Sequence, residues 1–147
     1  MKLHVCWIGK TKEAGIAALT AEYLKRLARY TSTESHEMPS EEALLKLAER
    51  ASGRTRPTLV MLDMRGRQLS SEEFAELLRE QQERGSQNLI FAIGPADGFS
   101  AATRAAADLV ISFGKMTLAH ELARVVLLEQ LYRGFTILKG HPYHTGH

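Results

Sequence analysis

The chain ends in a run of histidines whose spacing could suit a metal ion. His141, His144 and His147 lie three residues apart, and imidazole nitrogen is a frequent zinc ligand. Pro142 and Gly146 interrupt the run, so the three side chains are not expected to share one face of a helix. No cysteine or acidic residue lies nearby to complete a ligand set. We therefore predict that the tail holds no metal ion.

Three loops that follow apolar segments carry residues suited to ligand binding. Leu62-Asp63 ends the first segment, Gly94 to Gly98 follows the second, and Phe113 to Leu118 follows the third. Glycine lets a backbone approach a ligand closely, although one such loop alone would be explained by turn chemistry. If the segments are parallel strands, their carboxyl ends meet at one sheet edge, where α/β proteins bind ligands. The three loops together predict a pocket for a flat or extended cofactor.

The motifs of several enzyme classes are missing. The chain has neither G-x-G-x-x-G nor G-x-x-x-x-G-K-[ST], which disfavours dinucleotide and phosphate-loop sites. It lacks the G-x-S-x-G elbow, so a small hydrolase or phosphotransfer enzyme is the weaker alternative. The run from His120 to Arg124 begins like the zinc-protease motif H-E-x-x-H but has arginine in the fifth position. Cys6 is expected to be a small buried strand residue rather than a nucleophile.

Strand and helix signals alternate along the chain. Strands are predicted at 2–8, 32–38, 58–63, 88–93 and 109–112, the second of them polar and therefore at a sheet edge. Helices are predicted over the apolar repeat from Ile16 to Leu27, after Ser40 with Gly53 as C-cap, after the capping box at Ser70, from Ser100 to Ala107, and from about Ala119 past Leu131. This alternation predicts an α/β fold, with a mainly parallel sheet flanked by helices in a single domain over 1–147.

The last predicted helix is apolar on more than one side. Its apolar residues cover more than the stripe of roughly 100° that one-sided packing needs; they are Leu122, Val125, Val126, Leu127, Leu128 and Leu131. A deeply buried core helix would explain this pattern. In so small a domain, however, a helix-mediated homodimer is the favoured interpretation.

Composition and charge predict a cytoplasmic protein. No stretch approaches the roughly 18 consecutive apolar residues of a membrane span, and no secretory signal is recognisable. A single cysteine gives no sign of an oxidising compartment. The net charge of +2 is too small to indicate nucleic-acid binding by itself.

Three ordered motifs in the last third of the chain resemble those of a known family. They are Thr117-Leu118-Ala119-His120-Glu121-Leu122-Ala123-Arg124, Glu129-Gln130-Leu131-Tyr132-Arg133 and His141-Pro142-Tyr143-His144. The family is ribosomal RNA large-subunit methyltransferase H, of the SPOUT class, and the resemblance extends over the whole chain. It implies methylation of N3 of a pseudouridine in bacterial large-subunit (23S) ribosomal RNA, with S-adenosylmethionine as donor. It also implies a homodimer and a trefoil knot in the C-terminal half. Knots are rare in proteins, so this expectation comes from the resemblance alone.

The resemblance implies the donor contacts, and the chemistry of methyl transfer to N3 gives hypotheses for residues in and near the tail. The expected donor contacts are Leu62, Gly94, Phe113, Gly114, Lys115, Met116, Thr117 and Leu118. His144 is the first candidate for the base that removes the N3 proton, a role that contributes about 10²–10⁴-fold to a rate. Tyr143 is expected to stack on or hydrogen-bond the target base. Arg124 and Arg133 are candidates for phosphate or oxyanion contacts, although Arg133 could equally pair with Glu129 at helical spacing.

Two residues depart from the family pattern. Pro95 stands where the family usually has a second glycine, and Thr145 stands where it often has arginine or lysine. Proline fixes φ near −65° and donates no amide hydrogen, so the loop would differ if the turn needs either. A degenerate relative that binds RNA or ribosomes without methyl transfer is therefore the alternative function. Because the net charge is small, we expect weak binding to naked RNA and recognition of the assembled ribosome.

Overall fold

The computed structural model describes residues 1–50 and 55–145, and within them strands and helices alternate as predicted. The strands are β1 (Lys2–Ile8), β2 (Ser32–Met38), β3 (Thr58–Gln68), β4 (Asn88–Ile93) and β5 (Leu109–Ser112). The helices are α1 (Ala14–Leu27), α2 (Glu41–Arg50), α3 (Ser71–Glu83), α4 (Ala101–Ala105) and α5 (His120–Leu138). None of the helices in these two ranges is long and apolar enough to cross a membrane.

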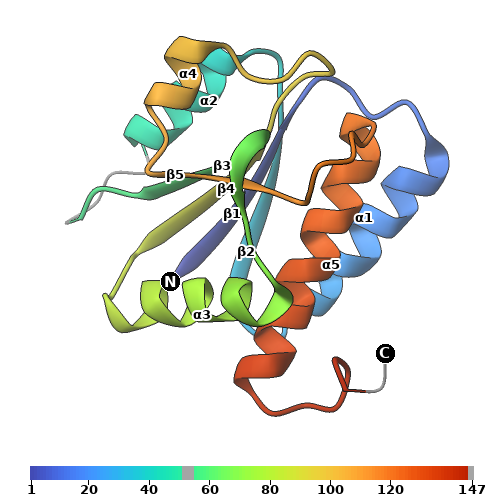
Figure 1. Cartoon of the computed structure of the whole chain (residues 1–147), viewed down its shortest axis with the longest axis vertical. Helices are drawn as coiled ribbons and strands as arrows, with labels where there is room; N and C mark the ends of the chain where they lie inside the picture. Colours follow the sequence, from blue (N-terminus) through green and yellow to red (C-terminus); the bar gives the residue numbers. More distant parts are fainter. Residues whose placement is uncertain (51–54, 146–147) are drawn as a thin grey trace.

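The strands form one parallel sheet in the order β2-β1-β4-β3-β5, covered by helices on both faces (Figure 1). Successive side chains of a strand point to opposite faces, so each strand contributes to two cores. Leu3 and Val5 of β1 pack in the core beneath α1, α3 and α5, whereas Cys6 packs in the core on the side of α2 and α4. The predicted sheet and the polar edge strand 32–38 are both confirmed.

Serine side chains cap the N-termini of three helices. The Oγ of Ser70 accepts a hydrogen bond from the amide of Glu73, and the Glu73 carboxylate accepts one from the amide of Ser70. This reciprocal pair is the predicted capping box. Ser100 caps α4 through the amide of Thr103, and Ser40 accepts from the amide of Ala43. The predicted C-cap at Gly53 lies outside the described residues.

Strand β3 is longer than predicted and makes a second contact with β5. Its pairing with Ile111 is made first by Leu62 and again by Arg67, with a register break between them. The polar residues after Asp63 do not predict a strand, but Arg67 and Gln68 pair with β5. At Gly66 the two backbones touch, since a Cβ there would lie 2.6 Å from the carbonyl carbon of Ile111. The trefoil knot stays a prediction from the family resemblance.

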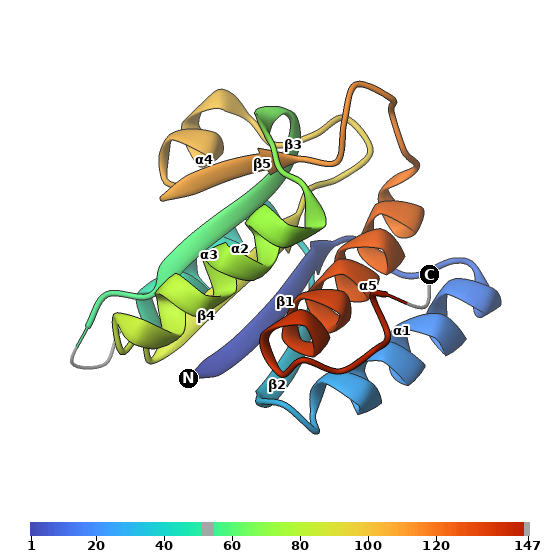
Figure 2. The same cartoon turned by 60° about the horizontal axis from the view of Figure 1, so that its bottom comes forward.

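Helix α5 lies between α1 and α3 on one face of the sheet (Figure 2). These neighbours and the sheet bury Leu127, Leu128 and Leu131 completely. The apolar residues on several sides of α5 are therefore largely covered by the chain itself. Leu122 is the exception, with 52% of its surface exposed near the start of the helix.

Candidate functional site

A pocket lies at the carboxyl ends of β4 and β5 and beside residues 62–65 in the middle of β3, where the loops after β4 and β5 meet the first turn of α5. Most of the predicted donor contacts line it: Leu62, Gly94, Phe113, Gly114, Met116, Thr117 and Leu118. Lys115 is not among the lining residues. The structure thus brings together loops that are separated by up to fifty residues in the sequence, at the edge where parallel sheets bind ligands.

The loop after β4 accommodates Pro95 without strain. The amide of Gly98 donates a hydrogen bond to the carbonyl oxygen of Pro95 at 2.8 Å, which closes a tight turn. The left-handed residue of the loop is Gly98, with φ of 82°, a conformation that favours glycine. Proline supplies the acceptor of this turn, and the turn uses no amide at position 95. Pro95 therefore fits the loop, and it is one of the residues that line the pocket.

The loop after β5 is held by Ser112. Its Oγ accepts a hydrogen bond from the amide of Gly114 at 3.1 Å and donates to the carbonyl oxygen of Gly114 at 2.9 Å. Gly114 has φ of 125°, which favours glycine. The apolar side chains of Phe113, Met116 and Leu118 remain exposed around the mouth of the pocket. They offer apolar surface to a ligand with a flat ring.

Several lining residues were not predicted as donor contacts. Asp63 has a side chain only 5% exposed, accepts a hydrogen bond from the amide of Arg65, and lies against Gly98. Its place directly after the buried residues Leu59–Leu62 is a usable signal, because a polar residue that ends an apolar strand segment lies near the ligand edge of a parallel sheet. His120 and Ala123 reach the pocket from α5. Their contribution depends on where α5 starts relative to the sheet, which local sequence does not reveal.

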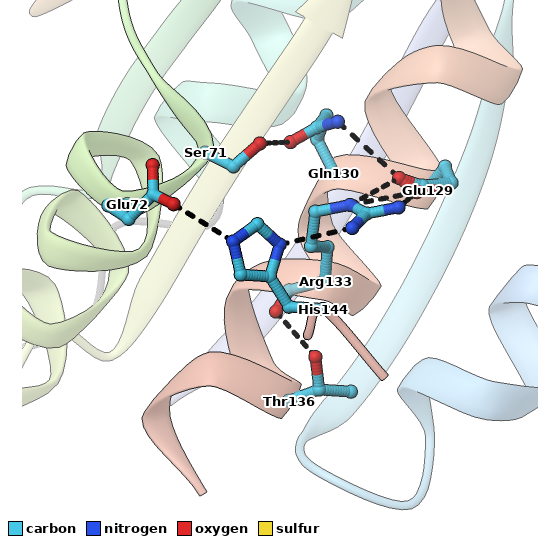
Figure 3. Close-up of polar contacts among 7 residues, drawn as sticks. All are labelled: Ser71, Glu72, Glu129, Gln130, Arg133, Thr136 and His144. Atoms are coloured by element: carbon cyan, nitrogen blue, oxygen red, sulfur yellow. Dashed lines mark hydrogen bonds and ion pairs between the residues drawn. The ribbon is translucent and has the colours of Figure 1, made fainter. Parts of the chain in front are cut away.

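A second polar cluster lies at the other end of α5, where the tail folds back (Figure 3). The Nδ1 of His144 lies 3.0 Å from an Nη of Arg133, and its Nε2 lies 2.8 Å from a carboxylate oxygen of Glu72 in the first turn of α3. Arg133 is also paired with Glu129 at 2.8 Å, as its helical spacing predicted. Arg133 can only donate, so Nδ1 of a neutral His144 accepts and Nε2 carries the proton.

Tyr143 packs inside this tail cluster. Its ring meets the ring of Tyr132 edge-on at 4.7 Å, and the guanidinium carbon of Arg133 lies 5.0 Å from its centre. Burial, followed by a hydrogen bond with Tyr23, raises the pKa of Tyr143 to about 12. The phenol is therefore protonated at neutral pH and can donate a hydrogen bond but cannot act as the base. This leaves His144 as the candidate base.

The remaining tail histidines do not converge. The Nδ1 of His141 lies 2.6 Å from the hydroxyl of Tyr30, away from the partners of His144. His147 lies outside the described residues. The geometry of the described tail thus points to hydrogen bonding rather than to shared metal coordination.

Arg124 lies in the core and not on a surface that RNA could reach. Its side chain is 1% exposed, its guanidinium carbon lies 3.9 Å from the centre of the Trp7 ring, and it donates to Thr11 at 2.8 Å. Burial lowers the pKa of Arg124, opposed by Glu121 one turn earlier. Glu121 in turn accepts hydrogen bonds from the amides that precede α1. Arg124 therefore positions the start of α5, and with it one wall of the pocket, rather than contacting phosphate in this conformation.

The tail cluster and the pocket are separate within one chain. None of Arg133, Tyr143 and His144 lines the pocket. His120, which does line it, and Arg133 are thirteen residues apart on α5, a rise of about 20 Å. A smaller hollow lies between the two, lined in part by Ser71 and Gln130, whose side chains are hydrogen-bonded at 2.7 Å.

Proteins that match this chain over nearly their whole length are named as methyltransferases. A protein of Koribacter versatilis named ribosomal RNA large subunit methyltransferase H is 64% identical over 147 residues, which is 100% of both chains. Its namesake in Geotalea daltonii is 43% identical and covers 98% of this chain and 99% of its own. Residues 1–144 match the family model described as "Predicted SPOUT methyltransferase".

Solved structures share the fold at low sequence identity. The SpoU methyltransferase AviRb from Streptomyces viridochromogenes, in complex with AdoMet, superposes with a TM-score of 0.56 at 18% identity, over 88% of this chain and 56% of AviRb. A probable methylase family protein from Haemophilus influenzae has a TM-score of 0.61 at 10% identity, over 96% and 69% of the two chains. The likeness in fold agrees with the full-length sequence match, and the chain belongs to the SPOUT methyltransferases, within the family of ribosomal RNA large subunit methyltransferase H.

Proposed function

We propose that this chain transfers a methyl group from S-adenosylmethionine to N3 of a pseudouridine in bacterial large-subunit (23S) ribosomal RNA, in the cytoplasm. The observation that carries the proposal is the pocket, because the loops that the family uses for its donor meet there in this chain. The relative of 64% identity bears a name that specifies large-subunit ribosomal RNA. AviRb, which has the same fold, is described in complex with AdoMet.

The pocket suits a donor with an apolar ring, a ribose and a charged tail. Leu62 and Leu118 supply apolar surface, while the turn at Gly98 and the loop at Gly114 expose backbone to a ligand. A Cβ at Gly94 would lie 3.1 Å from the ring of Phe99, so a side chain there would disturb the pocket wall. When bound, S-adenosylmethionine supplies an activated methyl group on a sulfonium ion.

The tail cluster supplies the groups that the acceptor needs. N3 of pseudouridine must lose a proton when it is methylated, and His144 can take it on Nδ1 once that nitrogen is released from Arg133. Tyr143 keeps its proton and can stack on or hydrogen-bond the base. Arg133 remains charged beside Glu129 and can hold a phosphate or an oxyanion.

The rise along α5 favours a homodimer in which each tail serves the partner's pocket. Within one chain, Arg133 lies about 20 Å along the helix from the pocket residue His120. Methyl transfer requires reacting atoms within about 3–3.5 Å. Leu19 of α1, Leu118 before α5 and Leu122 in the first turn of α5 leave apolar surface uncovered, and Leu118 lines the pocket. A second copy bound there would cover this surface and could bring its own tail to the pocket.

Two inactive variants should therefore complement each other. His144→Ala removes the candidate base, and Gly114→Val places a side chain in a loop that needs φ of 125°. When the two are coexpressed in equal amounts, half of the dimers combine them, and each of these has one intact site. Methyl transfer should recover to about a quarter of the wild-type value. No recovery from isolated heterodimers would show that each tail serves its own chain.

The preferred substrate should be the assembled ribosome. With a net charge of +2, the chain gains little from nonspecific attraction to phosphates and depends on a shaped RNA surface. Ribosomes from a strain lacking the gene should accept one methyl group per particle, located by mass spectrometry of RNA fragments. Ribosomes that already carry the methyl group are the control. Equal activity on free RNA would overturn the requirement for assembly, and no incorporation into either would overturn the proposed function.

A further inference from the structure

A cluster of two imidazoles and a carboxylate lies on the edge of the sheet, away from the pocket and the tail. His4 is on β1, and Glu34 and His36 are on the neighbouring edge strand β2. The parallel register places His4 opposite Glu34, and His36 follows two residues later on the same face. One ligand atom from each side chain lies within 4.8 Å of the others.

The spacing of these three atoms matches that around a small metal ion. The Nδ1 of His4 is 3.1 Å from the Nε2 of His36, and Oε2 of Glu34 is 3.8 Å and 3.4 Å from these two nitrogens. Three points so spaced lie on a circle with a radius of about 2.0 Å, which is close to the length of zinc bonds to imidazole nitrogen and carboxylate oxygen. An ion near the centre of that circle would be at bonding distance from all three.

The surrounding contacts orient the ligand atoms of His4 and Glu34 toward a shared cation position. The Oδ1 of Asn88 accepts the proton on Nε2 of His4 at 2.8 Å, which leaves the lone pair of that imidazole on Nδ1. Such an outer hydrogen bond orients most metal-bound histidines. The other oxygen of Glu34 is paired with Lys2, so Oε2 is the one that faces the imidazoles.

The degree of exposure allows an ion to enter. The His4 side chain is 5% exposed and fixed, while those of His36 and Glu34 are 24% and 44% exposed. The two imidazole planes are within 20° of each other, and their facing nitrogens share one hydrogen bond. Coordination requires the more exposed His36 ring to turn and the shared proton to leave.

We propose that His4, Glu34 and His36 bind one divalent transition-metal ion, with zinc as the best fit, and that water completes its coordination. Imidazole ligands suit zinc, copper and nickel, whereas calcium and magnesium prefer oxygen. The ion would link the edge strand β2 to β1, which is next to it in the sheet. This role is independent of methyl transfer, because the ligands belong to neither the pocket nor the tail cluster.

The test is calorimetric titration of zinc chloride into the full chain without a polyhistidine tag. We expect one ion per chain and a rise in the melting temperature that EDTA reverses. His36→Gln and Glu34→Gln should each weaken zinc binding by roughly tenfold or more, since each removes one ligand. Both positions are on the partly exposed edge strand, so these variants should stay folded, as circular dichroism would show.

The control is His141→Ala, which removes an exposed tail histidine and should leave the zinc titration unchanged. Cobalt absorption in the wild-type chain should show nitrogen coordination and should be lost in His36→Gln. The proposal is overturned if zinc does not bind, or if folded His36→Gln and Glu34→Gln bind it as tightly as the wild type. Loss of binding in His141→Ala alone would assign the ion to the tail instead.

Discussion

Replacing His144 with alanine is expected to lower the rate of methyl transfer by about 10²–10⁴-fold, the usual contribution of a well-placed general base. Donor affinity should be unchanged, because His144 does not line the pocket. The same tail contains Tyr143, whose pKa of about 12 keeps it protonated at neutral pH. The loss in rate should therefore not be compensated by the neighbouring phenol.

His141→Ala is the matched control for this variant. His141 is in the same tail, three residues earlier, but it contacts Tyr30 rather than Arg133 and Glu72. Single-turnover kinetics with the ribosomal substrate would measure the rate, and calorimetry with S-adenosylmethionine would measure donor binding. His144 would lose the role of base if its alanine variant kept full activity, or if donor binding fell as much as the rate.

The hydrogen bonds of His144 must change before it can act as a base. In this conformation Arg133 donates to its Nδ1, and its Nε2 proton is held by Glu72. Because Nε2 already carries the proton, the ring can accept another only on Nδ1, and Nδ1 is occupied by Arg133. The tail conformation within one chain is therefore a resting arrangement, and substrate binding must displace Arg133 from Nδ1.

Gly66→Ala is expected to destabilise the fold by about 3 kcal/mol or more, at the upper end of what overpacking usually costs. A Cβ at this position would lie 2.6 Å from backbone atoms of Ile111 and Val110. A flexible side chain could turn away from such a contact, but the backbone of β5 is held in the sheet by β3. Either β5 or the end of β3 must move.

The movement should also reach the pocket. Ile111 and the loop that follows it line the pocket, so donor binding should weaken together with stability. Urea unfolding would measure the loss of stability, and calorimetry with S-adenosylmethionine would measure the loss of donor binding. Gly15→Ala is the control, because nothing lies within 4 Å of a Cβ there and alanine favours the helix by about 0.5–1 kcal/mol. Equal stability of Gly66→Ala and the wild type would show that the two strands can separate at this point.

Most helices and strands, and the residues of the pocket loops, can be predicted from local interactions along the chain. The capping box at Ser70 needs only residues within one turn, and its hydrogen bonds are those that the sequence predicts. Parallel strands bring their carboxyl ends together, so Leu62, Gly94 and the run from Phe113 could be placed at one edge before the structure was known. The buried Cys6, with burial raising its pKa to about 12, likewise follows from its place in an apolar strand.

Contacts between distant segments were decided only by the tertiary structure. The backbone contact at Gly66 depends on the register of β3 against β5, and the pairing of His4 with His36 depends on the register of β1 against β2. Arg124 looked like a surface charge until the packing of α5 against Trp7 buried it. The sequence by itself determined which residues belong to the pocket loops and the tail. The tertiary structure decided that the tail folds back onto the first turn of α3, where His144 meets Glu72, instead of reaching the pocket of its own chain, because this contact joins segments far apart in the sequence.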